Sequence, residues 1–229
     1  MTPVRVYQAA LRHVSAEGCY SLLDDSEKKR ASAMTHARAR AEFIKSRGLL
    51  RLVLADHLAK RPSGLAFAIG INGKPYLAGD DGLEFNVSHS GEVALIAVSR
   101  SPVGIDIEKA DASIDHLSIA ETVFSSEERV TLGKAPEAQR ENVFLWLWTR
   151  KEAYLKATGS GFSSDLAQIS SVSPDGRIVD HSQPPASPPW YAIDLPAPAN
   201  FRAALVARTK DVDLSVTDIS EDLPSFFRH

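Results

Sequence analysis

Cysteine and long apolar runs are almost absent from this sequence. Cys19 is the single cysteine among 229 residues, so the chain can form neither an internal disulfide nor a metal site built on several thiolates. The longest uncharged apolar run in the middle of the chain, residues 93–98, is far shorter than the roughly 20 residues that cross a bilayer. The N-terminal residues include Arg5 and lack the apolar core of a signal peptide. We therefore expect a protein of the reducing cytoplasm without a transmembrane helix.

The remaining composition is ordinary, but the charge is unevenly distributed. With 44% hydrophobic and 24% charged residues, the chain does not belong to the disordered, collagen-like or coiled-coil classes. Up to Arg61 it has 12 Lys and Arg against 6 Asp and Glu, a balance of +6, whereas the remainder has a balance of −9. A basic first quarter is suited to binding a polyanion. A solvated helix face with scattered charges explains the same excess.

The spacing of apolar residues indicates an α+β fold with two similar lobes. Helices are predicted at 26–34, 35–58, 115–123, 126–132 and 137–157. Strands are predicted at 4–11, 65–69, 83–87, 93–98, 103–108, 167–172, 190–195, 202–207 and 214–219. We expect an N-terminal lobe of residues 1–102 and a C-terminal lobe of residues 103–229. The two lobes would be pseudo-symmetric, each with a small antiparallel sheet packed against a long helix.

The segment Gly104-Ile105-Asp106-Ile107-Glu108 places two carboxylates on one face of a predicted strand. Residues two apart on a strand project to the same side, so Asp106 and Glu108 lie together while the isoleucines face the opposite way. Adjacent carboxylates repel each other unless a cation or a basic group lies between them. Hard oxygen ligands of this kind suit Mg²⁺ that is bound together with substrate phosphates. An edge strand with a solvated acidic face remains the alternative.

The predicted helix at 137–157 gathers aromatic, acidic and basic groups on one side. Trp148, Glu152 and Lys156 follow one another at i, i+4 and i+8, and Lys151 lies one step round the helix. A salt-bridged surface helix accounts for Glu152 and Lys156, but it does not account for Trp148, because exposing an aromatic side chain to water is costly. On a side that faces a cleft, Glu152 can complete a metal site or take a proton. Lys151 and Lys156 can then hold phosphate oxygens.

The neighbouring residues Ser88 and His89 do not indicate a hydrolase. Adjacent strand residues point to opposite faces, and no G-x-S-x-G motif surrounds Ser88. A strand end whose polar side chains face a phosphate fits the pair better, although a structural histidine explains His89 equally well. The histidines show no H-x-H or H-E-x-x-H pattern, so we expect no zinc site.

Taken in order, these motifs resemble those of the 4′-phosphopantetheinyl transferase superfamily. The matching motifs are Asn86-x-Ser88-His89-Ser90, Gly104-x-Asp106-x-Glu108 and Trp148-x-x-Lys151-Glu152-Ala153-x-x-Lys156, preceded by Phe43-x-x-x-Arg47 and Gly73-Lys74-Pro75. The length is similar to that of the two-lobed, monomeric surfactin-synthetase-activator type. The resemblance implies an enzyme that moves the phosphopantetheine arm of coenzyme A to a serine of an apo acyl or peptidyl carrier protein and releases 3′,5′-ADP.

The resemblance also implies an active site at the interface between the lobes. Asp106, Glu108 and Glu152 would bind Mg²⁺ together with the pyrophosphate of coenzyme A. Glu152 would also be the base for the carrier serine, directly or through water. Lys151 and Lys156 would offset the charge on the pyrophosphate in the transition state. Catalysis would thus depend on Asp106, Glu152 and Lys156.

The N-terminal lobe would hold most of the coenzyme A contacts. The residues implied are Ser88, His89 and Arg47 at the phosphates, and Lys74 and Pro75 at the adenine. Lys28 matches a basic position of the family, but the second basic position, three residues further on, is Ala31 here, so Arg40 is assigned in its place. The basic first quarter then has a purpose, because coenzyme A is anionic and carrier proteins are usually acidic.

Two other functions fit the same residues. One is a module that binds coenzyme A or a carrier protein without turnover, and the other is a Mg²⁺-dependent phosphotransferase acting on a nucleotide. The lack of a glycine-rich phosphate loop argues against the second. We expect a monomer, because one chain supplies both lobes of the cleft. We also expect no nucleic-acid or membrane partner.

Overall fold

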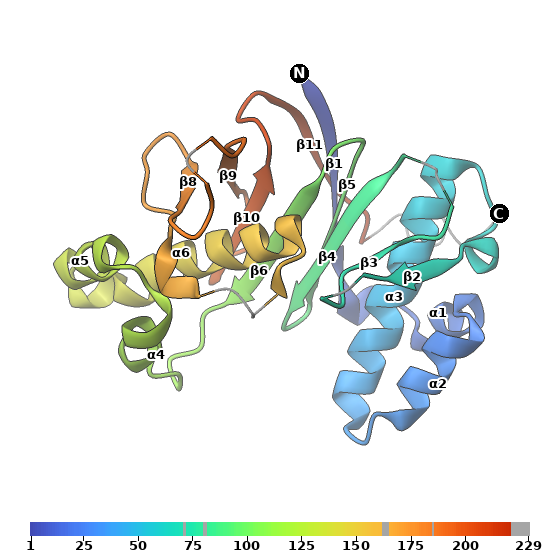
Figure 1. Cartoon of the computed structure of the whole chain (residues 1–229). Helices are drawn as coiled ribbons and strands as arrows, with labels where there is room; N and C mark the ends of the chain where they lie inside the picture. Colours follow the sequence, from blue (N-terminus) through green and yellow to red (C-terminus); the bar gives the residue numbers. More distant parts are fainter. Residues whose placement is uncertain (71, 80–81, 162–164, 185, 221–229) are drawn as a thin grey trace.

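The computed structural model describes residues 1–70, 72–79, 82–161, 165–184 and 186–220. In its first half, helices cover one face of a sheet (Figure 1). The helices are α1 (Ala16–Leu22), α2 (Asp25–Ala33) and α3 (Ala37–Leu58), with short 3-10 helices at Leu11–His13 and Pro62–Gly64. The strands are β1 (Thr2–Ala10), β2 (Phe67–Ile69), β3 (Pro75–Leu77), β4 (Glu84–Ser90) and β5 (Val93–Ser99).

The second half has the same mixture of helices and strands. Its helices are α4 (His116–Val123), α5 (Ser126–Lys134) and α6 (Glu137–Thr158), with a 3-10 helix at Leu166–Gln168. Its strands are β6 (Val103–Lys109), β7 (Ile169–Ser170), β8 (Arg177–Asp180), β9 (Trp190–Leu195), β10 (Phe201–Ala207) and β11 (Val212–Asp218). Within the described residues, no helix is both long enough and apolar enough to cross a membrane.

The predicted α+β class is confirmed, and the misses are all short elements. The predictions at 137–157 and 103–108 correspond to α6 and β6 almost residue for residue. Helix α1 was missed because its seven residues are too few to show a 3.6-residue period, although Ser15 caps it by accepting from the Gly18 amide at 3.1 Å. The three-residue β3 and four-residue β8 were missed because they are too short to show the two-residue alternation of a strand, and the strand predicted at 167–172 is reduced to β7.

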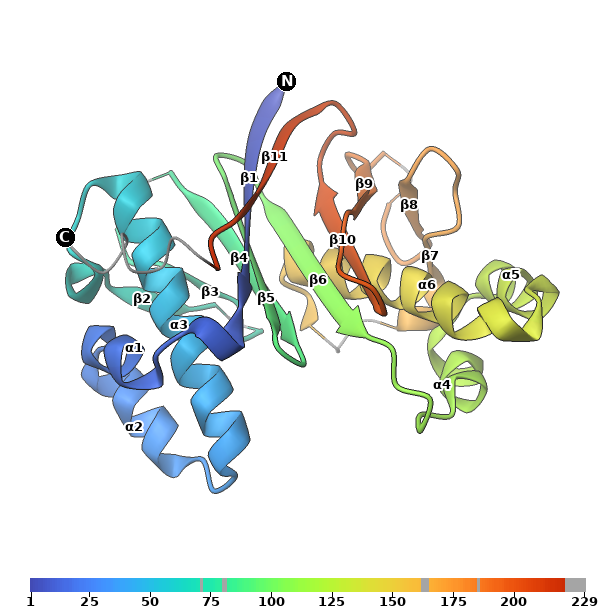
Figure 2. The same ribbon diagram turned by 180° about the vertical axis from the view of Figure 1, so that it is seen from behind.

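The described strands form two larger sheets and a small β2–β3 hairpin (Figures 1 and 2). The first sheet has the order β11-β1-β5-β4, and the second has the order β6-β10-β9-β8-β7. Neighbouring strands pair antiparallel except β1 and β11, which are parallel with Val4 opposite Leu214. The strand β11 therefore adds a segment from the end of the chain to the sheet of the first half.

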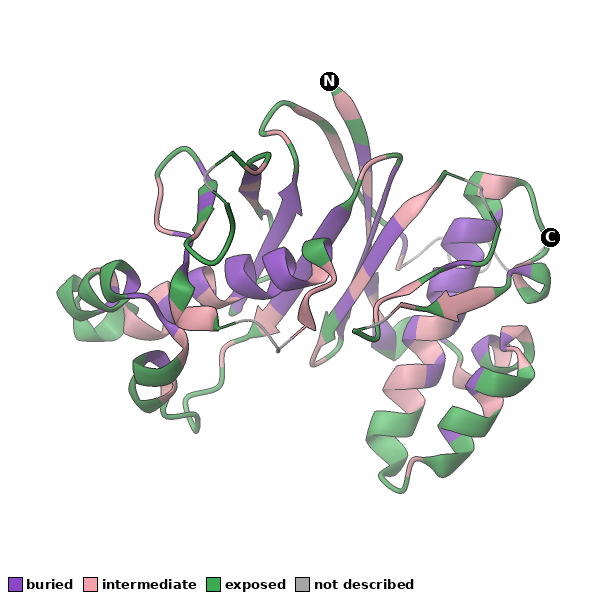
Figure 3. Cartoon of the chain, viewed as in Figure 1, coloured by how far each residue is buried: buried purple, intermediate pink, exposed green. Residues whose placement is uncertain are grey.

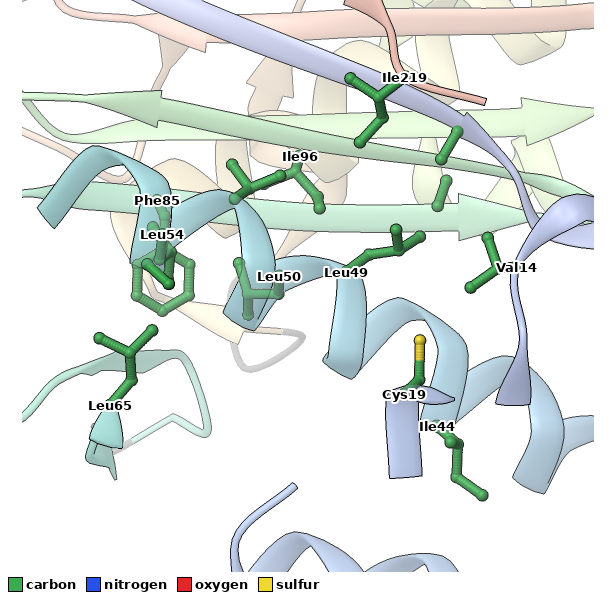
Figure 4. Close-up of a cluster of buried hydrophobic side chains, with 14 of the residues drawn as sticks. Val14, Cys19, Ile44, Leu49, Leu50, Leu54, Leu65, Phe85, Ile96 and Ile219 are labelled. Carbon is green, nitrogen blue, oxygen red and sulfur yellow. The ribbon is translucent and has the colours of Figure 1, made fainter. Parts of the chain in front are cut away.

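Helix α3 is held against the first sheet by its apolar stripe. Leu49, Leu50 and Leu54 are fully buried, and they pack with Phe85 of β4 and Ile96 of β5 (Figure 4). Burying one such leucine stabilises a fold by roughly 1.5–3 kcal/mol. The stripe therefore fixes α3, and with it the basic residues on the rest of the helix, relative to β4.

A second core lies between the two sheets. Val6 and Leu95 of the first sheet pack against Ile105, Ile107 and Leu205 of the second. The isoleucines of β6 thus face this core, as the alternation of the strand predicts. Asp106 and Glu108 consequently face the other way, toward α6.

Helix α6 crosses β6 closely because Gly104 has no side chain. A Cβ atom on Gly104 would lie 2.0 Å from the carbonyl oxygen of Ala153 and 2.4 Å from the backbone nitrogen of Ala157. Figure 3 shows the residues buried at this crossing, in contrast to the exposed outer faces of α2 and α5. The close approach brings the side chains of Glu152 and Lys156 to the carboxylate face of β6.

The two sheets meet at their edge strands, β4 and β6, which are joined by side chains. Asn86 Oδ1 accepts a hydrogen bond from the Ile105 amide at 2.8 Å. Because an edge strand leaves every second amide without a strand partner, Asn86 replaces one missing backbone hydrogen bond. Ser88 and Ser90 lie on the same face of β4 and reach the carboxylates of β6.

Candidate active site

A cavity of about 380 Å³ lies between the residues of α2, α3, β4, β6 and α6. Its wall includes Ser88, His89, Asp106, Glu108, Glu152 and Lys156, with Arg47 and Pro75 from the first half. A larger cavity of about 870 Å³ lies beside Tyr154 and Trp190 and contains none of these residues. We place the candidate site in the smaller cavity, because Asp106, Glu108 and Glu152 line it together with Lys156.

Asp106 is the centre of the cluster. Its side chain is 2% exposed. Oδ1 accepts from Ser88 Oγ at 2.8 Å and from Lys156 Nζ at 2.6 Å, whereas Oδ2 is buried without a hydrogen-bond partner. Glu152, which is 8% exposed, likewise has a buried Oε1 without a partner. Two residues that line the same cavity thus each have a buried carboxylate oxygen without a donor, which costs free energy unless a ligand satisfies it.

The pKa of each of the three carboxylates is raised above its ordinary value. Burial is the main cause for each, since it disfavours the charged form. Burial raises the pKa of Asp106, opposed by Lys156 and Ser88. Burial and the nearby Asp106 raise the pKa of Glu108, and the same two causes raise the pKa of Glu152 to about 7. One of the three carboxyl groups, that of Glu152, is therefore suited to exchanging a proton near neutral pH.

The donor set fits a hard divalent cation that is completed by other oxygens. Unpartnered carboxylate oxygens from two elements are the ligands that Mg²⁺ uses, and Mg²⁺ keeps water and phosphate oxygens in its remaining positions. Among the described residues, no group of three or more His, Cys, Asp and Glu side chains is placed to hold a metal ion by itself. The cavity thus fits a cation that enters with an anionic substrate better than one held by protein alone.

Basic groups also form part of the cavity wall. The guanidinium of Arg47 is paired with Glu27 and lies 4.6 Å from the ring centre of Phe67. His89 lines the same wall, where loss of hydration lowers its pKa. Arg30 also lines the cavity, 4.9 Å above the ring of Phe43, and sequence reasoning missed it. The available signal was that Arg30 directly precedes Ala31, where the family has a basic residue.

Two of the predicted phosphate ligands lie elsewhere on the first half. Lys28 Nζ lies 5.9 Å from the ring centre of Tyr20, and Lys28 is not part of the cavity wall. Arg40 lines a separate surface depression with Tyr20 and Ile44. The structure therefore does not bring these two bases to the carboxylates.

Lys151 is turned away from the cavity and is fully buried. Its Nζ is 2.6 Å from Glu128 Oε2 and donates to the carbonyl oxygens of Val123 and Leu166. Glu128 also closes the predicted capping box with Ser125 at the start of α5. The structure therefore gives Lys151 a role in joining α5 to α6, and we assign it no phosphate contact.

Lys74 fastens the β2–β3 hairpin to the end of α6. Its Nζ donates to the carbonyl oxygens of Ala157 at 3.2 Å and Val103 at 3.4 Å, and burial lowers its pKa. Asn72 makes a parallel contact with the Gly159 carbonyl at 2.8 Å. Pro75 lines the cavity, so the hairpin forms a wall of the site while Lys74 holds that wall in place.

Comparisons with known proteins agree on one family. Residues 102–206 match the family described as the 4′-phosphopantetheinyl transferase superfamily, and residues 13–101 match the family described as 4′-phosphopantetheinyl transferase, N-terminal. Together the two matches include all the residues of the cavity wall.

Curated relatives carry the same description. The 4′-phosphopantetheinyl transferase HetI of Nostoc sp. is 33% identical over 187 residues, which cover 80% of this chain and 77% of HetI. The 4′-phosphopantetheinyl transferase Sfp of Bacillus subtilis is 30% identical over 173 residues, 75% of this chain and 76% of Sfp. The 4′-phosphopantetheinyl transferase psf-1 of Bacillus pumilus is 38% identical over 141 residues, 59% of this chain and 60% of psf-1.

Proposed function

Because this chain belongs to the 4′-phosphopantetheinyl transferase superfamily, as an Sfp-like member, we propose that it transfers the 4′-phosphopantetheine of coenzyme A to a serine of an apo carrier protein. In this reaction the serine Oγ forms a bond to the phosphorus that carries pantetheine. The bond from that phosphorus to the neighbouring phosphate breaks, and 3′,5′-ADP leaves. The observation that carries the proposal is the pair of unpartnered carboxylate oxygens, on Asp106 and Glu152, beside the ammonium of Lys156.

Glu152 is the group that takes the proton of the carrier serine, directly or through a water. Without a cation its pKa is raised to about 7, so this carboxylate favours the addition of positive charge, as a proton or as Mg²⁺. Asp106 and Glu108 lie on the neighbouring strand and, by repelling negative charge, keep Glu152 ready to bind a proton. The position of α6 over β6 supports these assignments.

Mg²⁺ would be held by Asp106, Glu108 and Glu152 and would neutralise the pyrophosphate oxygens of bound coenzyme A. The ammonium of Lys156 would face the same pyrophosphate oxygens. Lys156 Nζ lies 2.6 Å from Asp106 Oδ1. The lysine side chain is 28% exposed and lines the cavity. A fixed positive charge at this point stabilises the negative charge that shifts to the leaving phosphate.

The first half would bind the remaining anionic groups of coenzyme A. His89, Arg30 and Arg47 form a basic wall that suits the 3′-phosphate, and Ser88 lies between this wall and the carboxylates. Pro75 would border the adenine, on the wall that Lys74 holds in place. Residues 1–102 thus supply the coenzyme A contacts, residues 103–229 supply the carboxylates, and one chain acting as a monomer completes the cavity.

The proposal is tested by weighing carrier proteins. The purified protein is incubated with coenzyme A, Mg²⁺ and a panel of apo carriers, each of which is then measured by intact mass spectrometry. We expect a carrier to gain the mass of one phosphopantetheine, and we expect EDTA to prevent the gain. If coenzyme A binds but no carrier changes mass, the chain is a binding module. If a parallel incubation that contains ATP consumes it instead, the chain is a nucleotide phosphotransferase.

A further inference from the structure

We propose that Ser90 is a positioning residue that orients Glu108 toward the divalent cation and coenzyme A. The inference rests on the function proposed above. Ser90 lies at the end of β4, and its Oγ donates to Glu108 Oε2 at 2.8 Å. Ser90 Oγ also accepts a hydrogen bond from the backbone amide of Lys109 at 3.1 Å.

The two hydrogen bonds of Ser90 fix the direction of its proton. A serine hydroxyl has one proton to donate and two lone pairs to accept with. Because the Lys109 amide occupies one lone pair, the hydroxyl is anchored to the backbone of the residue that directly follows Glu108. The anchored hydroxyl can therefore hold one oxygen of the Glu108 carboxylate in a constant place. Without it, the carboxylate can rotate broadly about its last torsion.

The same relationship occurs two residues earlier on both strands. Ser88 Oγ donates to Asp106 Oδ1 at 2.8 Å, as Ser90 Oγ donates to Glu108 Oε2. In each pair a serine of β4 holds one carboxylate oxygen of β6. For Asp106, this arrangement leaves the second oxygen unpartnered in the buried cluster. The repetition indicates that β4 serves to aim both carboxylates of the β6 motif.

The backbone also fixes the position of Ser90. Gly91 follows it with a φ of +54°, which starts the turn from β4 into β5, and Ser90 pairs with Val93 across this turn. A Cβ atom on Gly91 would lie 3.2 Å from the Lys109 side chain. The tight turn therefore keeps the end of β4 against β6, within reach of Glu108.

The size of the expected effect follows from groups that orient metal ligands in other proteins. Removing such a group typically lowers metal affinity about tenfold to a hundredfold. Glu108 keeps a second contact, since a hydrogen bond from Trp148 also lowers its pKa. We therefore expect the lower end of that range when Ser90 is replaced.

The test compares Ser90→Ala with Ser90→Thr, which keeps the hydroxyl, and with Ser99→Ala as a matched control. Ser99 is a buried serine of β5 that also accepts one amide, from Ser101 at 3.2 Å, and donates to one carbonyl, of Pro3 at 3.1 Å. Its replacement removes the same number of hydrogen bonds without touching a carboxylate of the site. Calorimetry with Mg²⁺ titrated into each protein in the presence of coenzyme A gives the Mg²⁺ affinity, and a transfer assay gives the Mg²⁺ concentration for half-maximal rate.

We expect Ser90→Ala to weaken Mg²⁺ binding and to raise the half-maximal Mg²⁺ concentration, each about tenfold. Ser90→Thr and Ser99→Ala should retain the wild-type values. If Ser90→Ala only lowers the melting temperature, as Ser99→Ala does, and leaves Mg²⁺ affinity unchanged, Ser90 is structural and the inference is overturned. Failure of the wild-type protein to transfer phosphopantetheine to any carrier would instead contradict the proposed function.

Discussion

The ammonium nitrogen of Lys156 lies 2.6 Å from Oδ1 of Asp106, which links α6 to β6 at the centre of the candidate site. The same nitrogen lies 2.9 Å from Ser88 Oγ on β4. One lysine thus connects the helix of the second half with the edge strands of both sheets. Under the proposed function, substrate phosphates that enter the cavity would meet a positive charge that is already fixed in place.

Replacing this lysine separates its catalytic effect from its structural effect. We expect Lys156→Met to lower kcat by about 10²–10³-fold, because a fixed group that stabilises developing charge is lost. The buried Asp106 also loses a hydrogen-bond donor, so the free energy of unfolding should fall by about 2 kcal/mol. Transfer kinetics and urea unfolding measure the two quantities. Lys134→Met, at an exposed position of α5, is the control, and wild-type kcat in Lys156→Met would contradict the assignment.

The raised pKa of Glu152 predicts a gain in stability when the acid is neutralised. Its folded pKa of about 7 exceeds the ordinary value of 4.5, so the native state binds a proton more tightly than the unfolded state. The metal-free protein should therefore lose stability as the pH rises from about 4.5 to about 7. Glu152→Gln removes this loss.

Urea unfolding in EDTA measures this difference between Glu152→Gln and the wild type. At pH 8 we expect the variant to be more stable by about 1–3 kcal/mol and inactive, whereas near pH 4.5 the two proteins should be nearly equal in stability. Equal stability at pH 8 would show that Glu152 is not buried among negative charges.

The contact of Lys74 with the end of α6 predicts an effect on coenzyme A binding. Lys74→Met keeps the aliphatic stem but removes the donor to the Ala157 and Val103 carbonyls. Because the hairpin that contains Lys74 forms the Pro75 wall of the cavity, we expect the KM for coenzyme A to rise about threefold to tenfold with a smaller change in kcat. Lys210→Met, at an exposed lysine, is the control. An unchanged KM would show that the hairpin does not depend on this contact.

The absence of a side chain at Gly104 predicts a severe effect of a single methyl group. Gly104→Ala would place a Cβ atom 2.0 Å from the Ala153 carbonyl, so α6 must move away from β6 or the fold must loosen. We expect a marked fall in melting temperature together with loss of transfer. Gly133→Ala is the matched control, because a Cβ atom at Gly133 in α5 has no neighbour within 4 Å and should stabilise the helix by about 0.5–1 kcal/mol. Equal melting temperatures for the two variants would refute the account of this crossing.

Several features of the site could be predicted because local periods determine them. The two-residue period of β6 places Asp106 and Glu108 on one face, and the helical period of α6 places Glu152 and Lys156 on one side. The cavity brings these four side chains together. The family resemblance to the 4′-phosphopantetheinyl transferases is likewise confirmed.

Other features depended on packing between elements that are distant in the sequence. Lys151 lies one helical step from Glu152, and this step of about 100° turns it toward Glu128 instead of the cavity. Arg30 reaches the cavity because α2 packs beside α3, which no local period reveals. The contact of Lys74 requires the β2–β3 hairpin to meet the end of α6, and those segments are short or far apart along the chain.

Under the proposed function, transfer of phosphopantetheine depends on the carboxylates of Asp106 and Glu152. The most direct measurement is the intact mass of an apo carrier protein after incubation with coenzyme A, Mg²⁺ and either the wild type or Asp106→Asn. We predict the gain of one phosphopantetheine with the wild type and none with Asp106→Asn, although circular dichroism should show both proteins folded. Transfer at the wild-type rate by a folded Asp106→Asn variant would contradict the account.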